Sequence, residues 1–263
     1  PDGHADMSRR NQVLDALQLT GWCLRQPEAG PPARASEVMM LPQPEVLPPS
    51  TGIQPAPAVI LAPSTAVMEQ LTATDDWDNL ARQVSGCRSC RLCETRTRTV
   101  LERGNRQAPL MLIGEGPGEQ EDLQGRPFVG PAGKLLDAML TATGWSPEQD
   151  VYVCNVVKCR PPGNRNPQPD EMAACQAYLQ AQIRLVRPRL IVALGRVAAQ
   201  SLLATELSIA RLRGQTHQYA GYPLVVTYHP AYLLRNLPDK ARAWQDLCRI
   251  RRELDTQVPG QSS

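Results

Sequence analysis

Long apolar runs are missing from this sequence of 263 residues. No stretch approaches the roughly 18 consecutive apolar residues that a helix needs to span a bilayer, and the N-terminal segment lacks the apolar core of a secretion signal. We therefore expect a cytoplasmic protein without a membrane anchor. The segment beginning at Met7 has the form of a native N-terminus, and the sequence leaves open whether Pro1–Asp6 are native.

Aromatic residues make up only 4 % of the chain, and Phe128 is its single phenylalanine. It stands near the end of LMLIGEGPGEQEDLQGRPFVG, residues 110–130, where an apolar strand runs into a glycine-rich turn carrying Glu115. Gly114 and Gly116 let the backbone of this turn approach a ligand closely. The turn lacks the Lys-Ser/Thr ending of a P-loop and the full dinucleotide glycine fingerprint, which disfavours a phosphate loop. A strand end with one aromatic residue indicates a pocket for a planar ligand.

The formal net charge of +2 hides a strong asymmetry. Residues 1–81 contain four Arg and ten Asp or Glu, a net charge of −6, whereas residues 82–263 contain 24 Lys or Arg and 16 acids, a net charge of +8. A basic domain fits a polyanion such as nucleic acid, although excess charge also serves solubility. Ten prolines from Pro27 to Pro63 predict an extended, solvated linker before a domain that begins near Asp75.

Apolar periodicity predicts an α/β fold, a single doubly wound domain with a four-stranded parallel sheet flanked by helices. The expected strands are 110–113, 151–157, 189–194 and 223–228, and the expected helices are 132–143, 169–186, 196–204 and 238–254. In such a sheet, ligands bind at the carboxyl ends of the strands. The glycine-rich turn, the segment after Asn155 and the segment after Tyr228 all begin there.

Four motifs share this edge: GEGPG, GRPFVG, VYVCNVVKCRPPGNRNP at 151–167 and HPAYLLRN at 229–236. In this order they closely resemble the family 4 uracil-DNA glycosylases, the iron–sulfur branch of that superfamily, over residues 84–254. The resemblance implies a DNA repair enzyme that hydrolyses the N-glycosidic bond of deoxyuridine in DNA. It would release uracil and leave an abasic site for base excision repair.

Recognition of a flipped uracil falls to three residues in this interpretation. Phe128 supplies a ring face for the base. The amide of Asn155 suits the adjacent O4 and N3–H of uracil and mispairs with cytosine, although Asn is also common in turns. His229 is placed to hydrogen-bond uracil O2 as negative charge develops. A lone His is more often structural, and the HPAYLLRN context favours the catalytic role.

Two acids and a glycine complete the predicted pocket. Glu115 would orient or activate the attacking water. Gly116 stands where the better-known branch of the superfamily has an Asp, so the resemblance supports Glu115 only as a neighbouring substitute. Glu121 either fills the space of the thymine methyl group or is a solvated loop acid.

The HPAYLLRN segment also predicts contacts with DNA. An apolar side chain pushed into the base stack fills the gap left by a flipped nucleotide, and Leu233 is our first choice for this wedge. Arg235 would then bind a phosphate. The alternative is that Leu233 and Leu234 belong to the core.

Eight cysteines without a secretion signal argue for metal binding or reactive thiols rather than disulfides. The resemblance implies that Cys87, Cys90, Cys159 and Cys175 hold a [4Fe-4S] cluster, whereas spacing alone would suit zinc equally well. Cys93 is expected to be a neighbour rather than a ligand. Cys154 is expected to be a buried core thiol, because alternation along a strand turns it away from Asn155.

Residues 9–27 carry a second resemblance, to the N-terminal peptide of the psi subunit of the bacterial replicase clamp loader. A peptide with Leu14, Leu17, Trp22 and Leu24 on a tether has the form of a docking motif, or of a helix packed on its own domain. We therefore expect a docking peptide at 1–27, a Pro/Ala-rich disordered linker at 28–74, the glycosylase domain at 75–256 and a flexible tail at 257–263.

The expected partners are uracil-containing DNA and a clamp-loader component, and the expected state is a monomer. The alternative function is a non-catalytic Fe–S protein that binds nucleic acid or transfers electrons, which would not need Phe128, Asn155 and His229 at strand ends. A DNA-cross-linking relative would carry an inserted basic loop with a nucleophilic His, and this chain runs from Lys158 directly into CRPPGNRNP.

Overall fold

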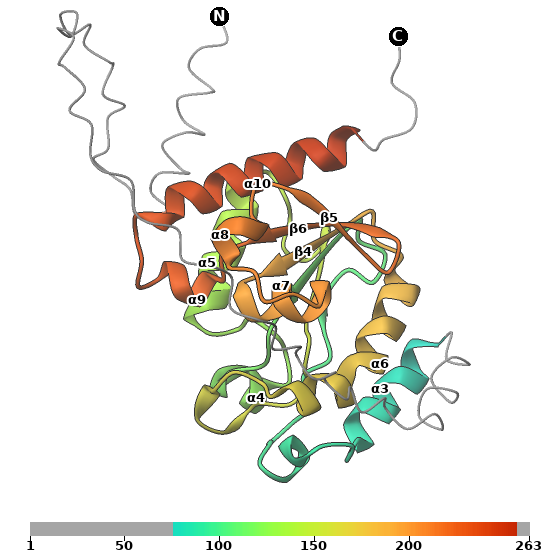
Figure 1. Ribbon diagram of the computed structural model, residues 1–263. Coiled ribbons are helices and arrows are strands. Elements are labelled where there is room, and N and C mark those ends of the chain that lie inside the picture. The colour runs from blue at the N-terminus through green and yellow to red at the C-terminus, as the bar shows by residue number, and fades with distance from the viewer. Residues whose placement is uncertain (1–75, 257–263) are drawn as a thin grey trace, which may run out of the picture. The chain divides into compact units, whose positions relative to one another are not determined.

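The computed structural model of the protein describes residues 76–256 (Figure 1). The predicted docking peptide, the predicted linker and the C-terminal tail lie outside the described residues. No helix within 76–256 is long and apolar enough to cross a membrane.

A six-stranded sheet with the order β1-β3-β2-β4-β6-β5 forms the centre of the domain. Its strands are β1 Arg103–Gly104, β2 Leu110–Gly114, β3 Val151–Asn155, β4 Leu190–Leu194, β5 Thr216–Tyr219 and β6 Tyr222–Thr227. The four strands β3, β2, β4 and β6 run parallel, whereas β1 and β5 are antiparallel edges. The predicted four-stranded parallel sheet is confirmed. The edge strands were not predicted, because β1 has two residues and β5 alternates only between exposed and half-buried positions.

Each of the four predicted helices is present within about two residues of its expected bounds. The helices are α3 Trp77–Gly86, α4 Glu119–Gln124, α5 Pro131–Ala142, α6 Pro169–Val186, α7 Arg196–Leu203, α8 Ile209–Leu212, α9 Pro230–Leu233 and α10 Asp239–Thr256, with 3-10 turns at Arg91–Glu94 and Pro162–Asn164. Proline stands in the first turn of α5, α6 and α9, where its missing N–H would have no intrahelical partner in any case.

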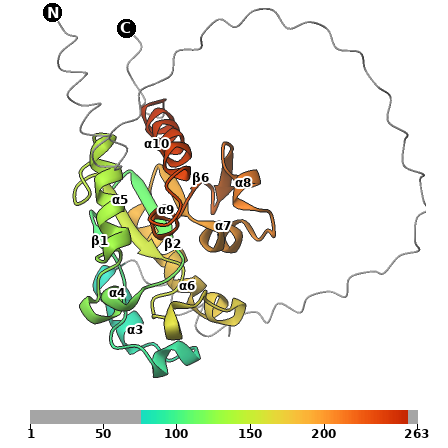
Figure 2. The same cartoon turned by 90° about the vertical axis from the view of Figure 1, so that its left-hand side faces the viewer.

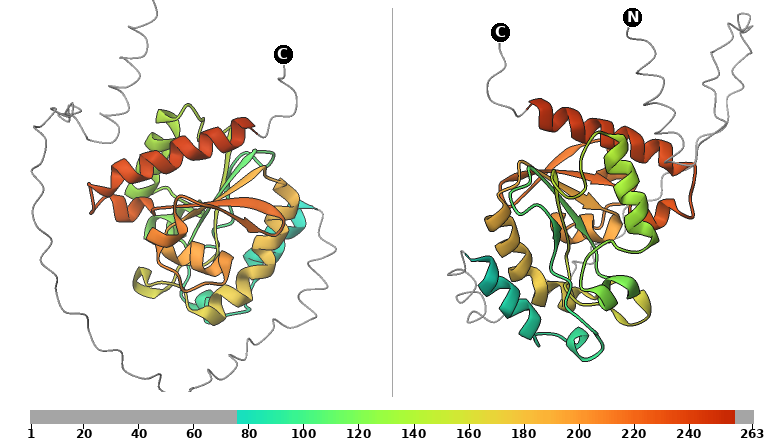
Figure 3. Two further views of the ribbon diagram at one scale, coloured as in Figure 1. Left: turned by 45° about the horizontal axis from the view of Figure 1, so that its top comes forward. Right: turned by 180° about the vertical axis from the view of Figure 1, so that it is seen from behind.

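Alternating residues of each parallel strand belong to two hydrophobic cores, one on each face of the sheet. Leu110 and Leu112 of β2 face the layer of α5 and α10, whereas Met111 and Ile113 face the layer of α3, α6 and α7. Figures 2 and 3 show these helix layers on opposite sides of the sheet. Because both faces are covered, the parallel strands are buried along their whole length or nearly so.

The carboxyl ends of the parallel strands meet at one edge of the sheet. Gly114 pairs in register with Asn155, and Leu194 pairs with Thr227. The chain turns from β2 to β3 on one side and later to β4 on the other, so the crevice above β2 is the topological switch point at which α/β sheets bind ligands.

Candidate active site

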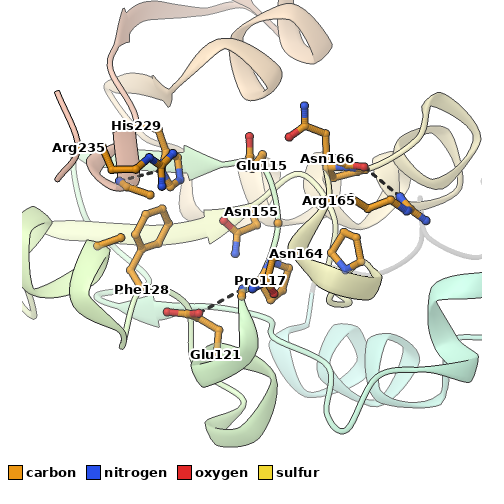
Figure 4. Close-up of a pocket in the computed structure, with 16 residues that line it drawn as sticks. Glu115, Pro117, Glu121, Phe128, Asn155, Asn164, Arg165, Asn166, His229 and Arg235 are labelled. Atoms are coloured by element: carbon orange, nitrogen blue, oxygen red, sulfur yellow. Dashed lines mark hydrogen bonds between the residues drawn. The ribbon is translucent and has the colours of Figure 1, made fainter. Parts of the chain in front are cut away.

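A cavity of about 400 Å³ opens at this edge of the sheet (Figure 4). Four segments build it: the turn after β2 with α4, the loop before α5, the segment after β3, and the segment after β6. The predicted site residues that line it are Glu115, Gly116, Glu121, Phe128, Asn155, His229 and Arg235. The structure therefore brings together seven residues from three separate parts of the sequence.

Asn155, the last residue of β3, is 1 % exposed. Its Oδ1 atom is buried and has no hydrogen-bond partner within the described part of the chain. A Cβ atom at Gly114 would collide with this Oδ1 and with the Phe128 ring, so glycine is required at the neighbouring strand end. An unpaired buried amide oxygen costs about 1–3 kcal/mol, which a ligand with an N–H group would offset.

Phe128 is held in an unusual backbone conformation with φ of +55°. A side chain at Gly133 would collide with the Phe128 carbonyl group, so α5 packs closely beneath this loop only because residue 133 is glycine. The Phe128 ring is 7 % exposed and lies against His229, with the ring centroids 5.6 Å apart and the planes at 32°. The loop geometry thus turns one ring face into the cavity wall.

His229 is the N-cap of α9, and its Nδ1 atom accepts a hydrogen bond of 3.1 Å from the Ala231 N–H group. The imidazole proton is therefore carried by Nε2. Burial lowers the pKa of His229 to about 4; the negative charge of Glu121 opposes this shift, and the positive charge of Arg235 adds to it. The ring is consequently a neutral N–H donor at physiological pH.

Glu115 follows β2 directly and lines the cavity. Burial raises the pKa of its carboxyl group, and the charge of Arg196 partly offsets this effect. A carboxylate with a raised pKa accepts protons more readily than an exposed one, which suits a general base.

The side chain of Glu121 is held by hydrogen bonds, so it is not the solvated loop acid that was one of the two interpretations of this residue. Its carboxylate accepts hydrogen bonds from the N–H groups of Gly118 at 3.1 Å, Val129 at 2.9 Å and Gly130 at 3.0 Å. Gly118 and Gly130 are the N-caps of α4 and α5, so one side chain joins the two loops that form this wall of the cavity. Exclusion of the thymine methyl group by Glu121 stays a prediction.

The structure corrects the prediction for Leu233. This side chain is 0 % exposed and packs in the core of the α5 and α10 layer, whereas Leu234 is 44 % exposed. Leu233 therefore cannot enter a base stack without leaving the core. Leu234 takes over as the candidate wedge, and Arg235, next to it, lines the cavity.

The cysteines predicted as ligands also converge, in a second and much smaller cavity. Cys87, Cys90, Cys159 and Cys175 line it together with Cys93. Among the described residues no group of three His, Cys, Asp or Glu closes around a single metal ion. Cys154 is fully buried in the core, away from this cavity, as predicted.

Two residues donate hydrogen bonds to the sulfur atoms that line the cysteine cavity. The Arg96 guanidinium donates to Cys159 Sγ at 3.0 Å and to the carbonyl oxygen of Cys87 at 2.8 Å. The backbone N–H of Lys158 donates to Cys175 Sγ at 3.3 Å. Burial raises the pKa of Cys175 to about 12, so this thiol needs a metal or cluster to be held as a thiolate.

Comparison with known proteins agrees with this geometry. The sequence profile described as "Uracil DNA glycosylase superfamily" matches residues 101–248. The chain belongs to the uracil DNA glycosylase superfamily. The predicted resemblance is thereby confirmed at the level of the superfamily.

Several similar proteins are named Type-4 uracil-DNA glycosylase. The protein from Thermotoga maritima is 46 % identical over 165 residues, which are 62 % of this chain and 85 % of the relative. The protein from Saccharolobus solfataricus is 40 % identical over 190 residues, which are 69 % of this chain and 88 % of the relative. The protein from Archaeoglobus fulgidus is 44 % identical over 165 residues, which are 60 % of this chain and 82 % of the relative.

The residues of one wall of this cavity were not predicted from the sequence. It is built by residues that follow Cys159: Pro161, Asn164, Arg165, Asn166 and Pro167. The fully buried carboxylate of Glu171 in α6 binds Arg165 through two hydrogen bonds of 2.6 and 2.8 Å. The sequence signal that could have identified this wall is the high frequency of Pro and Asn directly after a strand that ends at the ligand-binding edge of the sheet.

Proposed function

We propose that this protein is a DNA repair glycosylase that hydrolyses the N-glycosidic bond of deoxyuridine in DNA, releasing uracil and leaving an abasic site. The observation that carries the proposal is the unpaired, buried Oδ1 of Asn155 in a cavity that is also lined by an aromatic ring and a neutral histidine. These three groups match the edge, the face and the O2 atom of one uracil base.

Recognition begins with a uridine flipped out of the base stack. Its ring packs on Phe128, and its N3–H group donates to Asn155 Oδ1 while the Asn155 amide N–H donates to O4. Cytosine has an acceptor at N3 and a donor at N4, so the same amide orientation leaves both groups mispaired. Buried polar groups that lose their partners discriminate strongly, which accounts for selection of uracil over cytosine.

Cleavage moves the electron pair of the C1′–N1 bond onto the uracil ring and leaves positive character on the sugar. His229 stabilises the negative charge that develops at O2 through its Nε2–H group. Because the imidazole is neutral and prearranged by the Ala231 N–H group, it acts by hydrogen bonding rather than by losing a proton. One such donor is worth about 3 kcal/mol of transition-state stabilisation.

Glu115 acts on the nucleophile, a water molecule. Its carboxylate orients a water molecule toward C1′ and accepts a proton from it as the new C–O bond forms, while its negative charge offsets the charge on the sugar. The raised pKa caused by burial favours this proton transfer. The uracil anion takes up a proton on release and Glu115 returns its proton to solvent, so the products are free uracil and a deoxyribose with a hydroxyl group at C1′.

DNA contacts are assigned to the segment after His229. Leu234, exposed and next to the cavity-lining Arg235, fills the gap left by the flipped nucleotide, and Arg235 binds a backbone phosphate.

A [4Fe-4S] cluster is proposed for the cysteine cavity. Four thiolates complete the outer coordination of such a cluster, and each binds a different iron atom, so the sulfur atoms need not close around one ion. The N–H donors of Arg96 and Lys158 to two of these sulfur atoms fit a thiolate site, because hydrogen bonds to the sulfur atoms stabilise and tune a cluster. Bound in this cavity, the cluster would join the segment that follows α3, the segment after β3 and helix α6.

Residues 9–27 are proposed to bind a replicase clamp-loader component, on the strength of the psi-like peptide and the proline-rich tether alone. The tether would raise the concentration of the enzyme near newly copied DNA without new contacts to uracil. A monomeric, cytoplasmic protein stays our expectation from the sequence.

A glycosylase assay tests the proposed function. Oligonucleotides with one U, T, hypoxanthine or xanthine opposite each partner base are incubated with the protein, and alkali then cleaves any abasic site. The proposal expects cleavage at U and none at T. Absence of cleavage at U in both single-stranded and double-stranded DNA would contradict it.

A further inference from the structure

Lys158 is a buried lysine that neither the pocket chemistry nor the cysteine site explains. Its side chain is 1 % exposed and lies in the segment between Asn155 and Cys159. Burial of an ammonium group is costly unless nearby groups compensate its charge and bind its protons. A methionine or leucine would fill a similar volume without this cost, so the ammonium group at this position needs an explanation in terms of its contacts.

On one side, Lys158 contacts the recognition residue. Its Nζ atom donates a hydrogen bond to the carbonyl oxygen of Asn155. The next two N–H groups, of Val156 and Val157, donate to the carbonyl oxygens of Gly114 at 2.8 Å and Glu115 at 3.2 Å. The backbone on the C-terminal side of Asn155 is therefore fixed by three hydrogen bonds, one of which comes from Lys158.

On the other side, Lys158 lines the cysteine cavity. Its N–H group donates to Cys175 Sγ at 3.3 Å, and its carbonyl oxygen accepts from Val100 at 2.8 Å. With its backbone held at both ends, the lysine reaches from the thiols to the strand end that carries Asn155. Thiolates that hold the proposed cluster in this cavity would supply the negative charge that a buried ammonium needs.

We propose that Lys158 is a positioning residue that holds Asn155 in its uracil-reading orientation and places a fixed positive charge beside the cysteine cavity. The inference rests on the proposed glycosylase function and cluster. Because a side-chain rotamer follows its backbone, loss of the Lys158 hydrogen bond would loosen the Asn155 amide without removing it.

Three substitutions separate the two roles. Lys158→Arg keeps a donor and a charge, Lys158→Gln keeps a donor only, and Lys158→Met keeps neither. Lys134→Met, on the exposed face of α5, is the matched control for loss of a lysine. Iron content of each purified variant is measured first, and rates are compared per cluster.

The excision experiment is a double-mutant cycle with Asn155→Ala under single-turnover conditions. We expect Lys158→Met to slow uracil excision about tenfold in the wild-type background, the scale of a lost supporting hydrogen bond. In the Asn155→Ala background it should slow excision less than about twofold, because the effect runs through Asn155. An equal decrease of the excision rate in both backgrounds, or a wild-type excision rate in Lys158→Met, would overturn the positioning role.

The second readout is the reduction potential of the bound cluster. Removal of a nearby positive charge disfavours the added electron, so Lys158→Gln and Lys158→Met should both lower the potential, while Lys158→Arg and Lys134→Met leave it unchanged. Equal potentials in all variants would overturn the charge role. If Lys158→Met does not accumulate as folded protein, Lys158→Leu, which also keeps neither the donor nor the charge, takes its place in both tests. A wild-type protein without activity on uracil would instead refute the proposed function itself.

Discussion

Phe128 and His229 form one continuous wall of the pocket, with ring centroids 5.6 Å apart and planes tilted by 32°. Figure 4 shows the Asn155 side chain beside them in the same cavity. In the proposed mechanism, a planar base that packs on Phe128 presents its polar edges to His229 and Asn155 together. The same group of residues would then bind the base and stabilise its developing charge.

Glu115 predicts an acidic limb in the pH–rate profile. Because burial raises the pKa of this carboxyl group, the activating carboxylate is lost as the pH falls through a value above its usual range. Glu115→Gln should lower the excision rate and flatten this limb. Single-turnover rates from pH 4 to pH 8 test the prediction, and a Gln variant with the wild-type profile would exclude Glu115 as the titrating group.

His229 predicts a pH dependence of stability. Its pKa is about 4 in the folded protein and near 6.5 when unfolded, so the unfolded chain binds more protons between these values. The stability contributed by neutral His229 is complete above about pH 6.5 and is lost as the pH falls toward 4. The difference corresponds to about 3 kcal/mol at most.

Denaturant unfolding of the wild type and of His229→Asn from pH 4 to pH 7 tests this. The wild type should lose stability relative to the variant as the pH falls through this window. A constant difference between the two proteins would show that the imidazole is not buried in its neutral form.

The cysteine assignment predicts the colour of the protein. Purified without oxygen, the wild type should be brown with broad visible absorbance, and Cys87→Ala, Cys90→Ala, Cys159→Ala and Cys175→Ala should each lose it. Cys93→Ala and Cys154→Ala are the controls and should keep it, although Cys93 lines the same cavity. A colourless wild type that contains zinc would exclude the cluster.

The N-terminal segment predicts binding without catalysis. Deletion of residues 1–74 should abolish capture of a clamp-loader complex and leave excision from oligonucleotides unchanged. Trp22→Ala should cause most of the binding loss, because the indole is the largest apolar anchor in the peptide. A deletion that impairs excision would show that this segment belongs to the fold of the enzyme.

Much of the fold was accessible from sequence because its signals are local. The four parallel strands are continuous apolar runs, and α6 begins with Pro169 and Glu171, whose carboxylate accepts the Gln168 N–H group at 2.8 Å. The strand ends then identified Glu115, Asn155 and His229 as neighbours, and the structure places all three around one cavity.

Residues whose roles depend on tertiary contacts were less accessible. Adjacent leucines look alike in sequence, and only packing shows that Leu233 is in the core while Leu234 is exposed. The sequence left the role of Glu121 open between two interpretations and did not indicate its three backbone donors, because these come from two separate loops. The sequence did not indicate a role for Lys158, because its burial results from its position between the cysteine cavity and the end of β3.

The most direct test of the account is single-turnover excision of uracil by Asn155→Ala and His229→Ala. Each variant should excise uracil at least about 100-fold more slowly than the wild type, because each loses a group assigned to the base edge or to the leaving group. Circular dichroism and iron content confirm that the variants are folded and loaded. Wild-type rates in both folded variants would contradict the pocket as the site of uracil excision.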